Sequence, residues 1–190
     1  MPLEGELVRL REIRPGDEPL LASLRNNLAT QAWPKALPPD YTEEMVRRRY
    51  LDRDYSFDRK DGFFAVEWKA DDKAIGYAQY SGVEPRLRGW VGLAMTQPAW
   101  GTGASRDVME LLLRFCFEQL GLRVTMLGTH TGLPRMVGLA EKLGFKVAVR
   151  LRRSVWLGGE HHDGLVFDML REEYYAARPD LVDRLPDPFG

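Results

Sequence analysis

The hydrophobic positions of the first fifty residues predict one strand followed by two helices. Residues 6–11 predict a strand, with Leu7 and Arg9 on one face and Val8 and Leu10 on the other. Leucines within 20–28 recur at helical spacing behind Asp17, which is expected to cap that helix. A proline-rich break at 34–39 follows. Thr42 is then expected to cap a second helix whose first turn carries two glutamates.

Three strands are predicted next, at 63–68, 74–81 and 90–96. Short polar or glycine-containing links join them, which is typical of an antiparallel meander. The hydrophobic period then changes, because apolar residues over 108–116 recur at helical spacing and Gly121 is suited to end that helix. The meander is therefore expected to lead into an amphipathic helix.

The rest of the chain predicts a strand at 123–130, a short helix that Pro134 opens and Gly144 closes, and a hairpin. The two hairpin strands are expected at 145–156 and 165–170, joined by a Leu-Gly-Gly turn. Helices thus interrupt one mixed sheet, so the expected fold class is an α/β layered domain.

Length and composition favour one soluble domain. The 190 residues suit a single core, expected over 1–177, with a proline-containing tail at 178–190. A formal net charge of -1 disfavours nucleic acid as a partner. We find no apolar stretch long enough to span a bilayer and no signal-peptide pattern. A cytoplasmic protein without a membrane partner is therefore expected.

The cysteine and histidine content argues against a metal centre. The one cysteine, Cys116, excludes an intrachain disulfide and a cysteine-based zinc cluster, and its apolar helical setting predicts a core residue. His161, His162 and Asp163 resemble a metal cluster, but adjacent side chains of a strand point to opposite faces. We therefore expect a solvated hairpin there and no metal site.

The candidate chemistry lies in residues 93–108, where a strand runs through a glycine-containing loop into an amphipathic helix. Gly101 and Gly103 would let the backbone approach a ligand closely, because neither has a Cβ atom. The first amides of a helix lack intrahelical partners, and the helix dipole adds positive potential there. Such a loop suits a phosphate or pyrophosphate.

Several interpretations of this loop compete. A P-loop needs a Lys-Ser or Lys-Thr pair after its second glycine, and this loop has none. A dinucleotide fingerprint needs a third glycine in a parallel βαβ unit near the N-terminus, and neither is present. A coenzyme A pyrophosphate loop fits the spacing. A plain turn fits it as well, so the loop alone leaves these two open.

The residues around the loop resemble the GNAT acetyltransferase family. Leu93-Ala94-Met95, Pro98 and Trp100-Gly101-Thr102-Gly103 are similar to its strand and coenzyme A loop. The segments at 74–77 and 141–145 (Glu-Lys-Leu-Gly-Phe) are similar to two further family segments. Asp163 and residues 167–174 resemble the C-terminal strand of the branch that includes ribosomal-protein N-terminal acetyltransferases. The resemblance covers most of the chain.

This resemblance implies a GNAT-type single domain with a mixed, mostly antiparallel sheet flanked by helices. Acetyl-CoA would be the cosubstrate, in a V between the strands at 90–96 and 123–130. Backbone groups of Leu93, Ala94 and Met95 would pair with the pantetheine arm, and an amide among them would polarise the acetyl carbonyl. The pyrophosphate would be held at the loop, by the residues Trp100, Gly101, Thr102, Gly103, Ala104 and Ser105.

The side chains depart from the family pattern. Trp90, Leu133, Met136 and Ala140 stand where the family often has Glu, Asn, Ser and Tyr. The remaining candidates for proton transfer are His130, whose ordinary pKa suits that role, and Tyr77 on the acceptor side; each is also explained by strand packing.

The function implied is direct transfer of an acetyl group to a primary amine, either a protein or peptide N-terminus or a small molecule. Glu67 or Glu84 could hold a cationic acceptor. The alternative is a catalytically degenerate module that binds acyl-CoA as a sensor or scaffold. A longer acyl donor is a further hypothesis, because Met95, Leu133 and Met136 would make the thioester end apolar. A homodimer is compatible with the resemblance.

Overall fold

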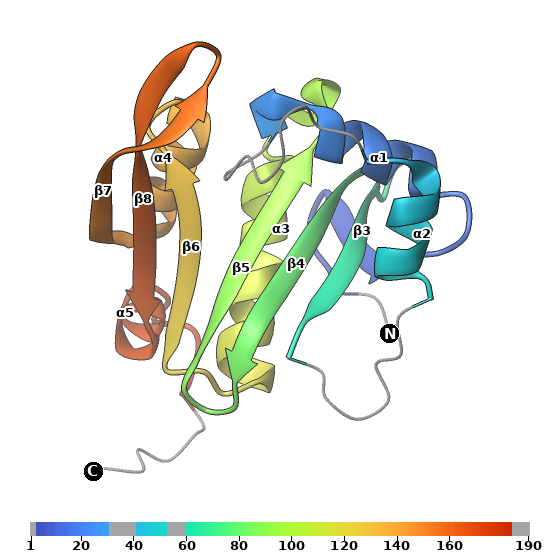
Figure 1. Ribbon diagram of the computed structural model, residues 1–190. Helices are drawn as coiled ribbons and strands as arrows, with labels where there is room; N and C mark the ends of the chain where they lie inside the picture. The colour runs from blue at the N-terminus through green and yellow to red at the C-terminus, as the bar shows by residue number, and fades with distance from the viewer. Residues whose placement is uncertain (1–2, 31–40, 53–59, 184–190) are drawn as a thin grey trace.

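The computed structural model describes residues 3–30, 41–52 and 60–183 (Figure 1). The predicted break at 34–39 and the tail prolines at 186 and 188 lie outside these residues. Within them the chain forms one eight-stranded sheet in the order β1-β2-β3-β4-β5-β6-β8-β7. Every neighbouring pair is antiparallel except β5 and β6, which are parallel. The mixed, mostly antiparallel sheet predicted from the sequence is confirmed.

The strands and helices follow one another in nearly the predicted order. The strands are β1 (Leu3–Glu4), β2 (Val8–Glu12), β3 (Gly62–Trp68), β4 (Ala74–Glu84), β5 (Arg88–Met95), β6 (Val124–His130), β7 (Lys146–Leu157) and β8 (Glu160–Leu170). The helices are α1 (Glu18–Asn26), α2 (Glu43–Tyr50), α3 (Ala104–Arg114), α4 (Pro134–Leu143) and α5 (Arg171–Ala176). A π-helical turn, Phe115–Gln119, extends α3, and 3-10 turns occupy Leu28–Thr30 and Gln97–Ala99. Among the described residues, no helix is long and apolar enough to cross a membrane.

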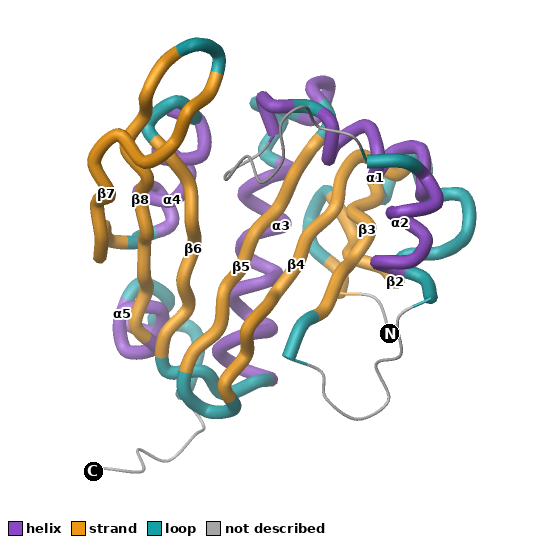
Figure 2. The backbone as a smooth tube through the Cα atoms, in the orientation of Figure 1, coloured by secondary structure: helices purple, strands orange, loops and turns teal. Residues whose placement is uncertain are grey.

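Helices cover both faces of the sheet (Figure 2). On one face α3 and α4 pack with β2, β4, β5, β6 and β8 in the larger core, which includes Val108, Leu112 and the fully buried Cys116. On the other face α1 and α2 pack in a second core that includes Leu24, Tyr50, Tyr77 and Ala94. Alternate residues of β5 therefore face different cores, since successive strand side chains point to opposite faces.

The helix ends show which local sequence signals were sufficient to predict where a helix begins or ends. The hydroxyl of Thr42 accepts a hydrogen bond of 3.2 Å from the amide of Met45, so the predicted cap of α2 is confirmed. Gly121 and Gly144 both have positive φ and end their helices as expected. Asp17 does precede α1, but its side chain makes no capping bond. Its carboxylate instead binds the guanidinium of Arg11 at 2.8 and 2.9 Å.

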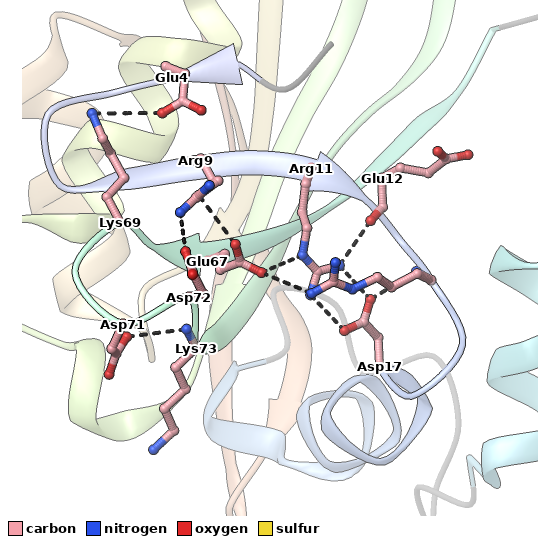
Figure 3. Close-up of polar contacts among 11 residues, drawn as sticks. Glu4, Arg9, Arg11, Glu12, Asp17, Glu67, Lys69, Asp71, Asp72 and Lys73 are labelled. Atoms are coloured by element: carbon pink, nitrogen blue, oxygen red, sulfur yellow. Dashed lines mark hydrogen bonds and ion pairs between the residues drawn. The ribbon is translucent and has the colours of Figure 1, made fainter.

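Asp17 belongs to a buried ion-pair network between β2 and β3 (Figure 3). Glu67 is 3% exposed, and its carboxylate contacts Arg9 at 3.2 Å, Arg11 at 2.6 Å and Arg14 at 3.4 Å. Arg9 also pairs with Asp72 in the turn after β3. A buried charge needs such partners because water no longer solvates it. The network attaches the start of α1 to the sheet.

The C-terminal part differs from its predicted form. The strand-like resemblance at 167–174 is wrong after Leu170, where β8 gives way to α5. Glu173 accepts a hydrogen bond of 3.0 Å from the Leu170 amide, which favours helix initiation there. Arg171 is buried and binds the Phe117 carbonyl and the carboxylate of Asp183. The beginning of the predicted tail is therefore attached to the domain.

Candidate active site

The site begins where the two central strands separate. β5 and β6 pair only through Arg88–Trp90 and Val124–Met126. Beyond these residues β5 continues to Met95 and β6 to His130, each paired only on its other edge. Figure 1 shows the two strands close at one end and apart at the other. The backbone edges that face each other across the resulting V have no strand between them.

A cavity of about 940 Å³ occupies this V, within the size range of small-molecule sites. Its walls come from β5, β6, the loop before α3, the first turns of α4 and the segment after α1. Its lining includes Gly92, Leu93, Ala94, Met95, Trp100, Gly101, Gly103, Ser105, Leu127, Gly128, Leu133 and Met136. Most of the predicted cofactor residues are therefore brought together. Thr102 and Ala104 do not line the cavity.

The loop before α3 has the backbone geometry of a phosphate site. Gly101 and Gly103 have φ of 76° and 95°, which only glycine adopts without strain. Within the described residues, no backbone carbonyl accepts from the amides of Gly101, Thr102, Gly103 or Ser105. These free amides and the helix dipole favour an anion at the N-terminus of α3.

Thr102 and Ala104 have a structural role in this loop. The Thr102 hydroxyl donates to the Ala99 carbonyl at 2.8 Å and accepts from the Ala104 amide at 3.3 Å. The Ala104 amide is therefore engaged within the loop, and Ala104 itself is fully buried. A contact of these two residues with the cofactor stays a prediction; the Thr102 amide is free to make one, whereas the Ala104 amide is already engaged.

The indole of Trp100 ties the loop to the end of β5. Its Nε1 donates a hydrogen bond of 2.9 Å to the Met95 carbonyl, and the guanidinium of Arg135 lies 4.9 Å from the ring centroid. Arg135 lines the cavity together with Arg106 and Lys142. Three basic side chains beside free loop amides fit the phosphates of coenzyme A, while the apolar lining between β5 and α4 fits its pantetheine arm.

The sequence prediction missed these three basic residues, although a signal for two of them exists. Arg135, Leu139 and Lys142 are spaced four and three residues apart on α4, which places them on one helix face. All three line the cavity. Arg106 lies in the first turn of α3, where a charged residue is usually explained by solvation alone.

The carboxylate of Asp107, in the first turn of α3, fixes the N-terminus of this helix to the start of the chain. Asp107 accepts hydrogen bonds from the amides of Glu6, Leu7 and Val8 at 3.2, 2.7 and 3.0 Å. These residues form the turn between β1 and β2, about a hundred positions earlier in the chain. The carboxylate also compensates the positive end of the helix dipole. The loop is thus held on a rigid part of the sheet.

His130 is not on the cavity surface. It is fully buried, and its Nδ1 accepts a hydrogen bond of 3.2 Å from the amide of Gly132, which itself lines the cavity. Its ring lies 5.6 Å from that of His162, centroid to centroid. His130 is the last residue of β6, at the open end of the V, but the chain turns over it and its imidazole does not line the cavity. A role in proton transfer stays a prediction, which this closed position does not favour.

Tyr77 lies on the other side of β5 from the α3 loop. It pairs in register with Ala94, which lines the cavity, and both belong to the core beneath α1 and α2. Its hydroxyl is 3.5 Å from Nη1 of Arg25. Tyr77 is 8% exposed and is not part of the cavity lining. It therefore borders the cavity through Ala94, and its catalytic role stays a prediction.

The two carboxylates suggested for a cationic acceptor are engaged elsewhere. Glu67 is buried in the arginine network described above. Glu84 pairs with Arg88 at 2.7 Å across the exposed turn between β4 and β5. His161, His162 and Asp163 form no metal-binding group in the described part of the chain, since Asp163 binds Arg150.

Comparison with known proteins identifies the fold family. A family model described as an acetyltransferase (GNAT) domain matches residues 8–146. The chain belongs to the GNAT acetyltransferase family. This membership confirms the expected enzyme class, an N-acetyltransferase that uses acetyl-CoA as cosubstrate. A curated relative, the "SPbeta prophage-derived uncharacterized N-acetyltransferase YokL" of Bacillus subtilis strain 168, is 26% identical over 178 residues. The alignment covers 90% of this chain and 93% of that protein.

Solved structures share the GNAT fold at low sequence identity. A spermidine N-acetyltransferase from Vibrio cholerae, in complex with CoA and spermine, has a TM-score of 0.76 and 20% identity. It covers 88% of this chain and 98% of its own. An acetyltransferase (GNAT family) from Bacillus anthracis has a TM-score of 0.73 and 16% identity, and covers 91% and 100% of the two chains.

Proposed function

We propose that this GNAT enzyme transfers the acetyl group of acetyl-CoA directly to a primary amine in a ternary complex. The observation that carries the proposal is the V between β5 and β6, whose cavity joins the free loop amides of α3 to the second core beneath α1 and α2. One ligand can approach from each side of β5. The CoA and spermine bound to the Vibrio cholerae neighbour agree with a cofactor and an amine in such a fold.

The main chain would supply most of the cofactor contacts. Along the edge of β5 at Leu93, Ala94 and Met95, the backbone groups that β4 does not pair would bind the pantetheine amides, as a neighbouring strand would, while the Met95 carbonyl already accepts from Trp100. An amide of this edge would stabilise the negative charge that develops on the acetyl oxygen. Acetyl-CoA supplies the activated thioester. Holding both reactants at one edge makes their reaction effectively unimolecular.

Direct transfer is favoured over a covalent acyl-enzyme. Cys116 is fully buried in the core, and burial raises the pKa of its thiol to about 12. A thiol in this state is a poor nucleophile, because the thiolate is the reactive form. Cys116 therefore cannot carry the acetyl group while the domain is folded.

A longer acyl donor is also consistent with the cavity. Leu133, Met136 and Leu139 of the α4 region face Leu93 and Met95 across the V. Such a lining would accommodate additional methylene groups, each of which contributes about 0.8 kcal/mol when buried. Comparing turnover of acetyl-, propionyl- and butyryl-CoA tests this variant of the proposal.

The second candidate is a module that binds acyl-CoA without turnover. The observation that favours it is the apolar character of positions where the family often has catalytic groups. Leu133 and Met136 line the cavity, and Ala140 is buried in the core. Kinship with ribosomal-protein N-terminal acetyltransferases and homodimer formation are predictions that these observations leave untested.

The first experiment is a calorimetric titration with acetyl-CoA of the wild type and Gly103→Trp. Substitution at Gly103 forces a side chain into positive φ at the loop, with Leu7 as its nearest neighbour, and is expected to weaken binding at least tenfold. Gly158→Trp is the matched control, since Gly158 also has positive φ and lies in the β7–β8 turn. Equal affinity of both variants would refute the loop assignment.

Turnover is measured separately, as thiol release with a panel of amines. Release with one or more amines is expected for the enzyme. Tight acetyl-CoA binding without release from any amine would favour the non-catalytic module.

A further inference from the structure

Arg25 is a half-buried cation to which the described residues supply no counterion. It lies in the last turn of α1, and no carboxylate pairs with it among the described residues. Its Nε is buried with no hydrogen-bond partner, and the one hydrogen bond of its Nη1 reaches the Tyr77 hydroxyl at 3.5 Å. A guanidinium removed from water normally gains a carboxylate or several acceptors, since unpaired burial is costly.

Three other buried or half-buried arginines follow that rule. Arg11 binds Asp17 and Glu67, Arg171 binds Asp183, and Arg178 binds Glu110 at 2.6 Å. Arg25, beside the second core, departs from this pattern among the described residues. The lack of a carboxylate partner at Arg25 therefore has a local cause and does not reflect the number of arginines in the chain.

Aromatic rings surround the guanidinium. It lies 4.8 Å from the centroid of the Tyr41 ring, and Tyr50 and Tyr77 are both buried in the same core. The Tyr50 hydroxyl is also buried without a hydrogen-bond partner among the described residues. Arg49 lies 5.7 Å from the Tyr50 ring and 5.9 Å from the Phe63 ring. The guanidinium groups of Arg25 and Arg49 thus lie at one aromatic cluster. In it, the Arg25 Nε and the Tyr50 hydroxyl lack hydrogen-bond partners among the described residues.

This cluster borders the cavity on the side away from the α3 loop. Tyr77 pairs in register with Ala94, and Ala29 lies four residues after Arg25, in the 3-10 turn that follows α1. Both alanines line the cavity. The phosphate-binding loop and its basic residues lie on the opposite side of β5. An anion at Arg25 would therefore belong to the acceptor and not to the cofactor.

We propose that the acceptor is an amine that also carries a carboxylate, and that Arg25 binds this carboxylate. The inference rests on the proposed acetyl transfer. A guanidinium offers parallel N–H donors that match a carboxylate, and tyrosine hydroxyls can complete its shell. The positive charge also favours the neutral form of a nearby acceptor amine, which is the form that attacks the thioester. A polyamine, which has only cationic groups, would be repelled.

The test compares matched acceptors in the thiol-release assay. Amino acids and dipeptides are paired with their C-terminal amides, phosphoethanolamine is paired with ethanolamine, and spermidine represents polyamines. Each carboxylate is expected to exceed its amide in kcat/KM by tenfold or more. Higher activity with phosphoethanolamine than with any carboxylate would assign the site to phosphate instead. Equal activity of acids and amides, or a preference for spermidine, would overturn the proposal.

Arg25→Gln, with Arg48→Gln as control, identifies the residue responsible. Arg48 is exposed on α2 and pairs with Glu44. Arg25→Gln is expected to lower kcat/KM for carboxylate acceptors at least tenfold while leaving their amides and the KM for acetyl-CoA within about twofold. Arg25→Lys should restore part of the loss. An equal loss for acids and amides would indicate a merely structural role.

A binding measurement keeps the inference separable from turnover. N-acetylated amino acids and their ethyl esters are titrated into the CoA-saturated wild type and Arg25→Gln. Binding of the acids, weakened at least tenfold by the substitution, supports the carboxylate site even if no amine is acetylated. No difference between acid and ester in the wild type would exclude the site whether or not the enzyme turns over.

Discussion

The indole Nε1 of Trp100 donates its hydrogen bond to the carbonyl oxygen of Met95. Met95 is the last residue of β5, so this bond fixes the proposed phosphate-binding loop relative to the strand edge that would hold the pantetheine arm. The two halves of the cofactor site are therefore positioned by one side chain. Its ring also supports Arg135, which brings a cation from α4 to the same place.

Trp100→Phe should weaken acetyl-CoA binding without unfolding the domain. Phenylalanine retains an aromatic face for Arg135 but cannot donate to Met95, and the loss of about 1 kcal/mol corresponds to a roughly fivefold higher Kd. Calorimetric titration measures the change. Trp156→Phe is the control, because Trp156 is half-exposed on β7. Unchanged affinity of Trp100→Phe would mean that the loop is positioned without this bond.

Glu67→Gln should destabilise the domain strongly, because Glu67 is the buried centre of the arginine network. It leaves Arg9 and Arg11 beside a neutral amide in a buried position, and the expected cost is about 3 kcal/mol in the free energy of unfolding. Urea denaturation measures it against Glu160→Gln, an exposed residue of the β7–β8 turn. Similar midpoints for the two variants would show that the network in Figure 3 contributes little.

The stability of the domain should fall at acidic pH partly through Asp17. Burial alone would raise the pKa of this carboxyl, but the Arg11 guanidinium and the Arg14 amide outweigh burial and hold it below its ordinary value of 3.8. The folded form thus binds the proton less readily than the unfolded form. The stabilisation is complete above the ordinary value and is lost as pH falls below it.

Thermal melts of the wild type and Asp17→Asn between pH 2 and 7 (roughly the range in which carboxyl groups titrate) check this. The variant should melt lower than the wild type at neutral pH, and the difference should shrink toward the acidic end. A constant difference across the range would contradict a titrating Asp17.

Cys116 should be unreactive in the folded enzyme. Because burial raises the pKa of its thiol to about 12, a disulfide reagent such as DTNB should modify it only after unfolding. Cys116→Ala should retain acetyl transfer, although the cavity it leaves would lower stability by about 1 kcal/mol. Rapid modification of the native protein, or loss of transfer in Cys116→Ala with the fold intact, would reopen a covalent mechanism.

Local sequence signals predicted the cofactor side well. The strand, the loop glycines and the amphipathic helix are contiguous, so their geometry depends on neighbouring residues and on positive φ at Gly101 and Gly103. Thr42 capped its helix for the same reason. The meander of β3, β4 and β5 was predicted from its short links, but the three-pair contact between β5 and β6 could not be read from either strand alone.

The failures involve partners that are distant in sequence. Asp17 has the right position for a cap, yet Arg11 and Glu67 determine its contacts. Glu67 was considered for the acceptor because no local pattern shows which strand residue faces a buried arginine. The sequence did not predict that His130 is buried, because its burial depends on the turn at Gly132 and on β8. The role of Arg25 emerges only from missing partners, which a sequence does not display.

The proposed cofactor site, made largely of main chain, would have an evolutionary consequence. Backbone amides are the same whichever residue bears them, so few positions beyond Gly101 and Gly103 need to be retained for acetyl-CoA to bind. The identities of 26% with the curated relative and 16% with the Bacillus anthracis structure are compatible with a shared fold. The acceptor side, where we propose that Arg25 acts, would depend on side chains and would have no such protection. Lineages can therefore exchange acceptors there by single substitutions while inheriting the donor unchanged.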